Sequence, residues 1–166
     1  PQPELTRNEY LRMLQAANLL GKEKTYFLIK VFAVMGIAVQ ELPLITVEAL
    51  RNRSIIRTGN QNVIRIPNCL REELLAYAER NHIQAGSVFR SRNGACINRT
   101  RVSNSIRSIC KEAHVPEEKG NPRCLRKLYL TTMASIESNI SVFIEQAYLR
   151  MLEDEQANFG WREQEN

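Results

Sequence analysis

The sequence NPRCLRKLYL, at residues 121–130, places three cationic side chains at the start of an expected helix. Pro122 favours the first helical position, and Arg123, Arg126 and Lys127 then follow at helical spacing. The unpaired N–H groups and the dipole already make a helix N-terminus positive, so cations are unfavourable there unless an anion binds. The stretch therefore predicts an anion-binding site.

The whole sequence is that of a globular protein rich in arginine. Its 166 residues suffice for a single domain with a buried core, and 43% hydrophobic and 25% charged residues are ordinary values. The net charge of +5 comes from 17 arginines and 6 lysines against 18 acidic residues. Because the planar arginine fork matches phosphate oxygens, this composition favours a nucleic-acid partner over a merely basic surface.

Several other kinds of site and partner are disfavoured. No apolar run reaches the roughly 18 residues of a membrane span, and we expect no signal peptide and no membrane partner. The four cysteines form no C-x-x-C pair, and the chain has only two histidines. We therefore expect free thiols, a cytoplasmic location, no metal and no other cofactor.

Residue periodicity predicts a mostly helical chain. The first helix is opened by Thr6 and Glu9 in capping-box spacing, and the second is closed by Gly36. These and the later helices are expected over residues 5–21, 25–36, 36–50 with Pro43 limiting it, 68–81 with Asn68 as cap, 98–113, 122–138 and 141–157. Two β-rich runs in residues 54–66 predict a hairpin, and residues 87–89 a short strand. The fold class is α+β, mostly α-helical with a small antiparallel β-sheet, in a single domain over residues 1–166.

Five segments in order resemble the catalytic domain of tyrosine recombinases, the phage and transposon integrases. They are LTRNEYLRML, VFAVMGIAVQELPLITVEAL, the hairpin ending in IRIP, VFRSRNGACINRTRVSNSIRSICKEAHV and NPRCLRKLYLTTM. The resemblance implies DNA recombination and DNA integration: one strand of double-stranded DNA is cut through a 3′-phosphotyrosine link and rejoined to another. It also implies a separate DNA-binding domain upstream of this one.

The family's chemistry depends on a particular set of side chains. The motif GLRxSEL supplies a first arginine, the hairpin turn a lysine, and H-x-L-R-H a histidine, a second arginine and a further basic residue. A histidine or tryptophan precedes the tyrosine nucleophile near the C-terminus. The arginines and the lysine stabilise charge that develops on the phosphate, and the phenol, with an ordinary pKa near 10, must lose its proton.

The sequence departs from this family pattern at most positions. GIAVQEL aligns with GLRxSEL so that Ala38 stands where the first arginine belongs, and residues 31–110 contain no lysine. In NPRCLRKLY, Arg123 replaces the histidine, Arg126 keeps the second arginine, and Lys127 fills the last position. Alanine cannot hold a phosphate, so the resemblance predicts a degenerate active site.

The C-terminal part of the sequence departs as well. Phe159 stands about where the nucleophile is expected, and the stretch EQAYLRMLEDEQANFGW contains no histidine at the position some nine residues earlier. Tyr148 lies about ten residues earlier, and it is either a half-buried packing residue or a displaced nucleophile. Trp161 is expected as a packing anchor. The candidate catalytic set is therefore Arg126, Arg123, Lys127 and Tyr148.

Other arginines are candidates for contacts with DNA phosphates because many lie close together in the sequence. Those around the hairpin are Arg51, Arg53 and Arg57, and those before and within the expected helix over residues 98–113 are Arg90, Arg92, Arg99, Arg101 and Arg107. If they follow the DNA backbone, affinity should fall steeply with salt concentration.

Three functions remain open on the sequence. In the first, the domain binds DNA but has lost strand transfer. In the second, it is an active recombinase that uses Tyr148. In the third, it is a protein-interaction module that binds no DNA. The last function rests on the acidic segment MLEDEQANFGWREQEN, which could dock onto another copy and form a homo-oligomer. Four or five scattered replacements in the catalytic set favour the first function.

Overall fold

The computed structural model describes residues 3–161 of the chain. The chain divides into two compact units, Pro1–Leu130 and Thr131–Asn166, which we call the first and second units. The helix α7, Pro122–Phe159, runs through both units. The single domain expected over residues 1–166 stays a prediction, and so does the domain expected upstream of it.

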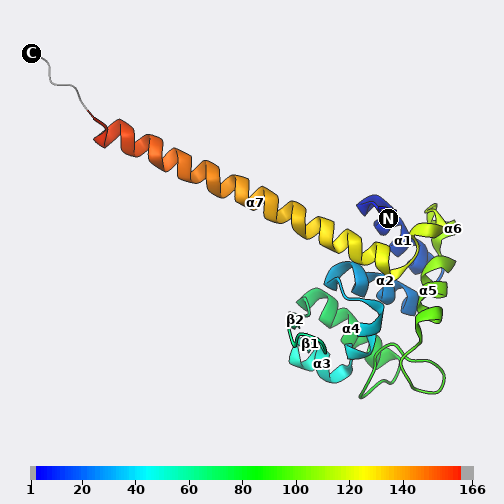
Figure 1. Cartoon of the computed structure of the whole chain (residues 1–166). Helices are drawn as coiled ribbons and strands as arrows, with labels where there is room; N and C mark the ends of the chain where they lie inside the picture. The colour runs from blue at the N-terminus through cyan, green and yellow to red at the C-terminus, as the bar shows by residue number, and fades with distance from the viewer. Residues whose placement is uncertain (1–2, 162–166) are drawn as a thin grey trace, which may run out of the picture. The chain divides into compact units, whose positions relative to one another are not determined.

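The first unit is mostly helical and holds one small antiparallel sheet, which confirms the predicted fold class (Figure 1). Before α7, its elements are α1 (Arg7–Leu19), α2 (Glu23–Met35), the 3₁₀ helix η1 (Val39–Leu44), α3 (Val47–Asn52), β1 (Ser54–Ile56), β2 (Val63–Arg65), α4 (Asn68–Arg80), α5 (Arg99–Ser108), α6 (Cys110–Ala113) and the 3₁₀ helix η2 (Glu117–Lys119). The strands pair so that Ile55 lies opposite Ile64. The predicted hairpin is thus present.

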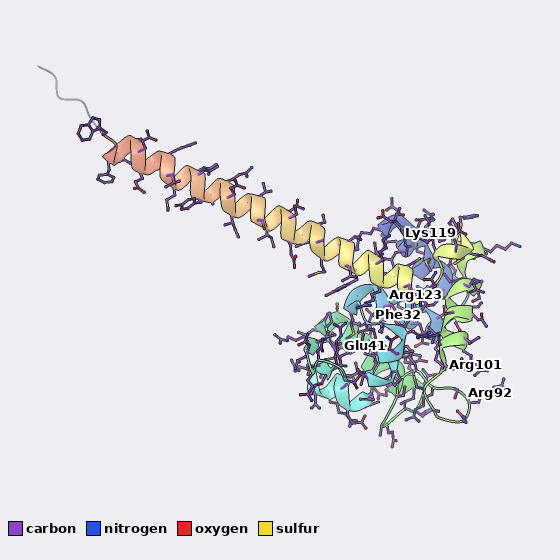
Figure 2. All side chains as sticks on the ribbon, viewed as in Figure 1. Phe32, Glu41, Arg92, Arg101, Lys119 and Arg123 are labelled. Carbon is purple, nitrogen blue, oxygen red and sulfur yellow. The ribbon has the colours of Figure 1, made fainter. Side chains whose placement is uncertain are left out.

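The helix α2 forms the centre of the core. It contacts α1, α4 and α5, and apolar side chains occur around most of its circumference. Leu28, Ile29, Val31 and Phe32 are fully buried, and Phe32 is labelled inside the first unit in Figure 2. A helix that is apolar on nearly all sides must be covered by neighbours, and the other helices supply that cover.

The start of α1 is closed by the predicted capping box. The Thr6 hydroxyl accepts a hydrogen bond from the Glu9 N–H at 3.1 Å, and the Thr6 N–H donates to Glu9 Oε1 at 2.9 Å. Lys119 also donates to Glu9 Oε1, at 3.0 Å. Burial acts to raise the pKa of Glu9, but the hydrogen bonds from Thr6 and Lys119 outweigh it and hold that pKa below its ordinary value.

The end of α2 meets the start of α7 at Gly36. This glycine has a φ of +64° and closes α2 with a left-handed residue, as its position in the sequence predicts. A Cβ atom there would lie 2.2 Å from the ring of Tyr129 in α7. Only glycine therefore fits, both for its conformation and for its close packing.

Residues 36–50 differ from the prediction of one short helix. The 3₁₀ helix η1 contains Pro43, and α3 begins separately because Thr46 caps it by accepting from the Ala49 N–H at 3.0 Å. The expected cap at Asn68 is also wrong by one residue. Pro67 holds the cap position of α4 and makes no side-chain cap bond.

Three further boundaries differ from expectation. Residues 87–89 form no strand, and their part of the chain has only isolated bridges between Thr46 and Ser87 and between Arg90 and Cys96. The expected helix over 98–113 is divided into α5 and α6 at Ile109. In contrast, the two expected helices over 122–138 and 141–157 are one helix, because no proline or glycine separates them. Neither α7 nor any other helix between residues 3 and 161 is apolar enough over sufficient length to cross a bilayer.

Candidate nucleic-acid interface

Three arginines from two helices line one groove in the first unit. A hollow of about 180 Å³ lies where the start of α7, the start of α5 and η1 meet, and an adjoining hollow continues along α5. We call the two together the arginine groove, and its lining residues are Ala38, Val39, Gln40, Arg99, Ser103, Asn121, Pro122, Arg123 and Arg126. The groove brings together two of the residues in the candidate catalytic set.

The first turn of α7 is held by its cap and by its buried face. Asn121 Oδ1 accepts a hydrogen bond from the Cys124 N–H at 3.0 Å. Leu125 and Leu128 are buried in the core, whereas Arg123, on another face of the helix, is exposed. The fold thus fixes the helix while the side chain of Arg123, which is labelled near the start of α7 in Figure 2, is exposed.

Arg126 is partly buried and anchored at the base of the groove. Its Nε donates a hydrogen bond to the Gly36 carbonyl at 3.0 Å. This bond leaves the two terminal nitrogens of the guanidinium, which can still bind an anion in a forked geometry. The close approach of Gly36 to α7 therefore also positions the retained arginine.

Arg99 enters the groove from the first turn of α5. Asn98 caps this helix by accepting from the Arg101 N–H at 2.9 Å, and α5 packs against η1. Within residues 3–161, no ion pair joins a carboxylate to Arg99, Arg123 or Arg126. The groove is therefore a concentration of positive charge that the described part of the chain does not neutralise.

Glu41 connects the groove to the hairpin and is a residue that sequence reasoning missed. Its Oε1 accepts from the Ala38 N–H at 2.8 Å, and its Oε2 accepts from Arg57 Nε at 2.7 Å. Arg57, predicted as a phosphate contact, is therefore paired with a carboxylate. The spacing of Ala38 and Glu41 equals that of Thr6 and Glu9, but alanine has no hydroxyl to complete a capping box, so the sequence carried only half of this signal.

A separate hollow, which is not part of the arginine groove, lies on the loop before α5. Arg92 and Arg101 are labelled beside this loop in Figure 2, and the hollow is lined by Ser91, Arg92, Asn93, Ala95, Cys96, Asn98 and Arg101. Arg99 and Arg101 thus line different hollows although they are two residues apart. The closely spaced arginines around the start of α5 are therefore divided between the arginine groove and this hollow.

The other predicted contacts lie outside these hollows. Arg90 is held by the backbone, because its guanidinium donates to the Ser87 carbonyl at 2.9 Å and also to the Ala85 carbonyl. Arg107 is exposed on α5 and lines neither hollow. Lys127 Nζ lies 3.9 Å from Glu4 Oε1 and is not part of the groove lining. The geometry therefore favours Arg99, Arg123 and Arg126 over these three.

Tyr148 belongs to the second unit, where 56% of its surface is exposed. Trp161 is 93% exposed and Phe159 is 86% exposed, so the described structure gives none of these three side chains a packing role. The nucleophile predicted at Tyr148 stays a prediction. The groove described above is formed entirely by residues of the first unit.

Comparison with known proteins identifies the fold. No protein-family model matches the sequence, and no curated protein matches it. Among solved structures, the crystal structure of XerA recombinase matches with a TM-score of 0.67 and 20% sequence identity. The fold is tyrosine-recombinase-like. The match covers 80% of this chain and 49% of the XerA recombinase chain, so this chain spans about half the length of the recombinase. The predicted resemblance is thereby confirmed at the level of the fold.

Proposed function

We propose that the first unit binds the phosphate backbone of double-stranded DNA through the arginine groove, and that it does not carry out strand transfer. The observation that supports binding most strongly is that Arg99, Arg123 and Arg126 line one groove. Three planar forks at one place suit the oxygens of a phosphodiester, and contacts of this kind position a duplex without reading its sequence.

The distribution of charge along the chain supports the same proposal. Residues 1–130 contain 21 basic and 11 acidic side chains, whereas residues 131–166 contain two and seven. The excess of positive charge thus belongs to the unit that carries the groove. Such a field attracts a polyanion and raises its rate of association.

The proposed loss of strand transfer follows from the residue types at the groove. Ala38 offers only a methyl group where the family has its first arginine, and residues 31–110 contain no lysine. Arginine keeps its proton at any ordinary pH, so Arg57 or Arg123 is a poor proton donor to a leaving oxygen. The groove is therefore suited to holding a phosphate and poorly suited to the proton transfers of cleavage.

DNA binding can be tested by fluorescence anisotropy with a short labelled duplex over a salt series. We expect affinity to fall steeply with salt, and the Arg126→Glu variant to bind far more weakly than the wild type. The matched control is Arg7→Glu, since Arg7 is exposed at the start of α1 and lines none of the hollows described above. Arg12 is unsuitable as a control because it donates to the Ala113 and His114 carbonyls. Equal losses in both variants would contradict a phosphate site in the groove.

Strand transfer is tested separately with nicked suicide duplexes that carry a pool of randomised sequences. Denaturing electrophoresis and mass spectrometry would detect a tyrosine-linked DNA adduct. We expect no adduct from the wild type. An adduct that the Tyr148→Phe variant fails to form would show that the domain is an active recombinase with a displaced nucleophile.

The second unit favours an additional role in protein contact. Its exposed apolar side chains include Ile136, Ile140, Ile144 and Met151, which recur at helical spacing on α7. Association of this helix with a second copy stays a prediction. Light scattering over a concentration series should show a mass that rises above the monomer value, and a constant monomer mass would contradict it.

A further inference from the structure

We infer that Arg99 supplies to the arginine groove the guanidinium that tyrosine recombinases carry at the position of Ala38. The inference rests on the proposed binding of DNA phosphate, and it assigns a particular residue to the replacement of a missing one. The assigned role of Arg99 is to bind a DNA phosphate, and it does not require that the DNA strand be cleaved.

Ala38 and Arg99 line the same hollow. Ala38 stands immediately before η1, Arg99 is the first residue of α5, and these two elements pack together. The Ala38 methyl group has neither the charge nor the hydrogen-bond donors that stabilise a phosphate oxygen. Arg99 brings a guanidinium to the same hollow from a different element, α5. The family resemblance alone does not indicate which residue could replace the missing arginine.

The other nearby arginines have different environments. Arg57 is paired with Glu41, and Arg90 is bonded to backbone carbonyls. Arg101, in the same turn of α5 as Arg99, lines the other hollow. Of the arginines predicted as additional phosphate contacts, Arg99 is therefore the one that the structure places in a hollow with Arg126.

The position of Ala38 allows a direct exchange experiment. Its backbone has φ −84° and ψ 160°, which any L-residue adopts, and its N–H is already held by Glu41. An arginine introduced here would begin in the hollow that Arg99 now reaches. The exchange variant combines Ala38→Arg with Arg99→Ala. It keeps the net charge and moves one guanidinium from position 99 to position 38 of the same hollow.

The Arg99→Ala change should leave the fold intact. Arg99 is exposed, and no hydrogen bond of its side chain appears among the contacts of residues 3–161. Alanine is also the best helix former, and removal of a cation from a helix N-terminus relieves an unfavourable interaction with the dipole. Weaker DNA binding by this variant would thus report on the lost guanidinium, and a melting curve of each variant verifies the fold.

The experiment compares wild type, Arg99→Ala, the exchange variant and an Arg7→Ala control on one duplex over a salt series. Loss of one phosphate contact should lower the slope of log affinity against log salt by about 0.9, which is roughly an eight-fold loss of affinity at about 0.1 M salt. We expect this loss in Arg99→Ala, its recovery in the exchange variant, and no change in the control.

Each other outcome has a separate meaning. If Arg99→Ala binds like the wild type, the inference is wrong while DNA binding by the groove stands. If the exchange variant stays as weak as Arg99→Ala, Arg99 acts at another place and the equivalence with Ala38 is wrong. If the wild type shows no salt-dependent binding, the proposed function fails and the inference fails with it.

Discussion

The starts of α1, α5 and α7 all have a side-chain cap, but only the first turn of α1 contains a carboxylate. At α1, the side chain of Thr6 accepts from the Glu9 N–H and the side chain of Glu9 accepts from the Thr6 N–H, so the carboxylate lies at the positive end of the helix. At α5 and α7, Asn98 and Asn121 each cap one N–H, but the first turn contains no acidic residue. Those turns carry Arg99, Arg101 and Arg123 instead.

The difference separates a helix start that the fold itself stabilises from two helix starts that we propose bind a ligand. A carboxylate near a helix N-terminus stabilises by about 0.3–1 kcal/mol, and a cation in the same place is unfavourable by a similar amount. At the start of α1, the capping box forms within the chain and needs no bound ligand. The starts of α5 and α7 carry cations and no carboxylate, which is a reason to propose that DNA phosphate binds in the arginine groove.

The largest effect that we predict concerns Gly36, against which the start of α7 packs. Gly36→Ala should lower the free energy of unfolding by roughly 2–4 kcal/mol, since the methyl group clashes with Tyr129 and φ is positive. The matched control is Gly21→Ala, which has a similar φ of +67° but no atom within 4 Å of the added Cβ. It should lose only about 1 kcal/mol. Equal losses in urea unfolding would contradict the packing described for α7.

Removal of the cap at α1 should have a smaller effect, and one confined to stability. Thr6→Ala should lower the free energy of unfolding by about 1 kcal/mol because the Glu9 N–H loses its acceptor. Thr6→Ser retains the hydroxyl and serves as the control. DNA affinity should be the same in all three proteins, and a parallel loss of affinity would mean that α1 also contributes to the interface.

The pH dependence of Glu9 should be smaller again. Its pKa in the folded state lies below the ordinary value of 4.5, so the ionised form stabilises the fold. That contribution is complete above the ordinary value and is lost as pH falls through the lower, folded-state pKa. The difference in unfolding free energy between wild type and Glu9→Gln should therefore shrink from about pH 7 to about pH 3. A constant difference would show that the Glu9 charge has no role.

The smallest predicted effect compares two cysteines near helix starts. Cys69 is exposed in the first turn of α4, whereas Cys124 is buried in the first turn of α7. Burial raises the pKa of the Cys124 thiol above its ordinary value, which lowers the thiolate fraction. Mass spectrometry after brief alkylation of the native protein should find the label on Cys69 and not on Cys124. Equal labelling would mean that the buried face of α7 opens readily.

The local features of the fold could be predicted from the sequence. Thr6 and Glu9 specify a capping box by their spacing alone, and Gly36 ends α2 where the apolar pattern stops. The hairpin in residues 54–66 has a comparable local signal. The break expected between the helices over 122–138 and 141–157 was wrong, because neither proline nor glycine is present there to stop the helix.

The candidate site could be predicted only in part because its geometry depends on residues distant in sequence. Arg126 and Arg123 were found from their helix and from the family resemblance. Arg99 joins them in the groove because α5 packs against η1. Arg57 does not, because it is paired with Glu41. A single sequence shows where guanidinium groups occur and does not show which carboxylates or carbonyls face them.

The proposed binding of a polyanion by the arginines at the starts of α5 and α7 can be tested directly by one melting experiment. Wild type and the Arg99→Ala, Arg123→Ala double variant are melted with and without excess duplex DNA. Without DNA, the variant should melt at the same or a higher temperature, because two unfavourable cations are gone. With DNA the order should reverse, since the ligand stabilises the protein that binds it more tightly. A variant that melts lower without DNA, or an equal shift of both proteins by DNA, would contradict the account.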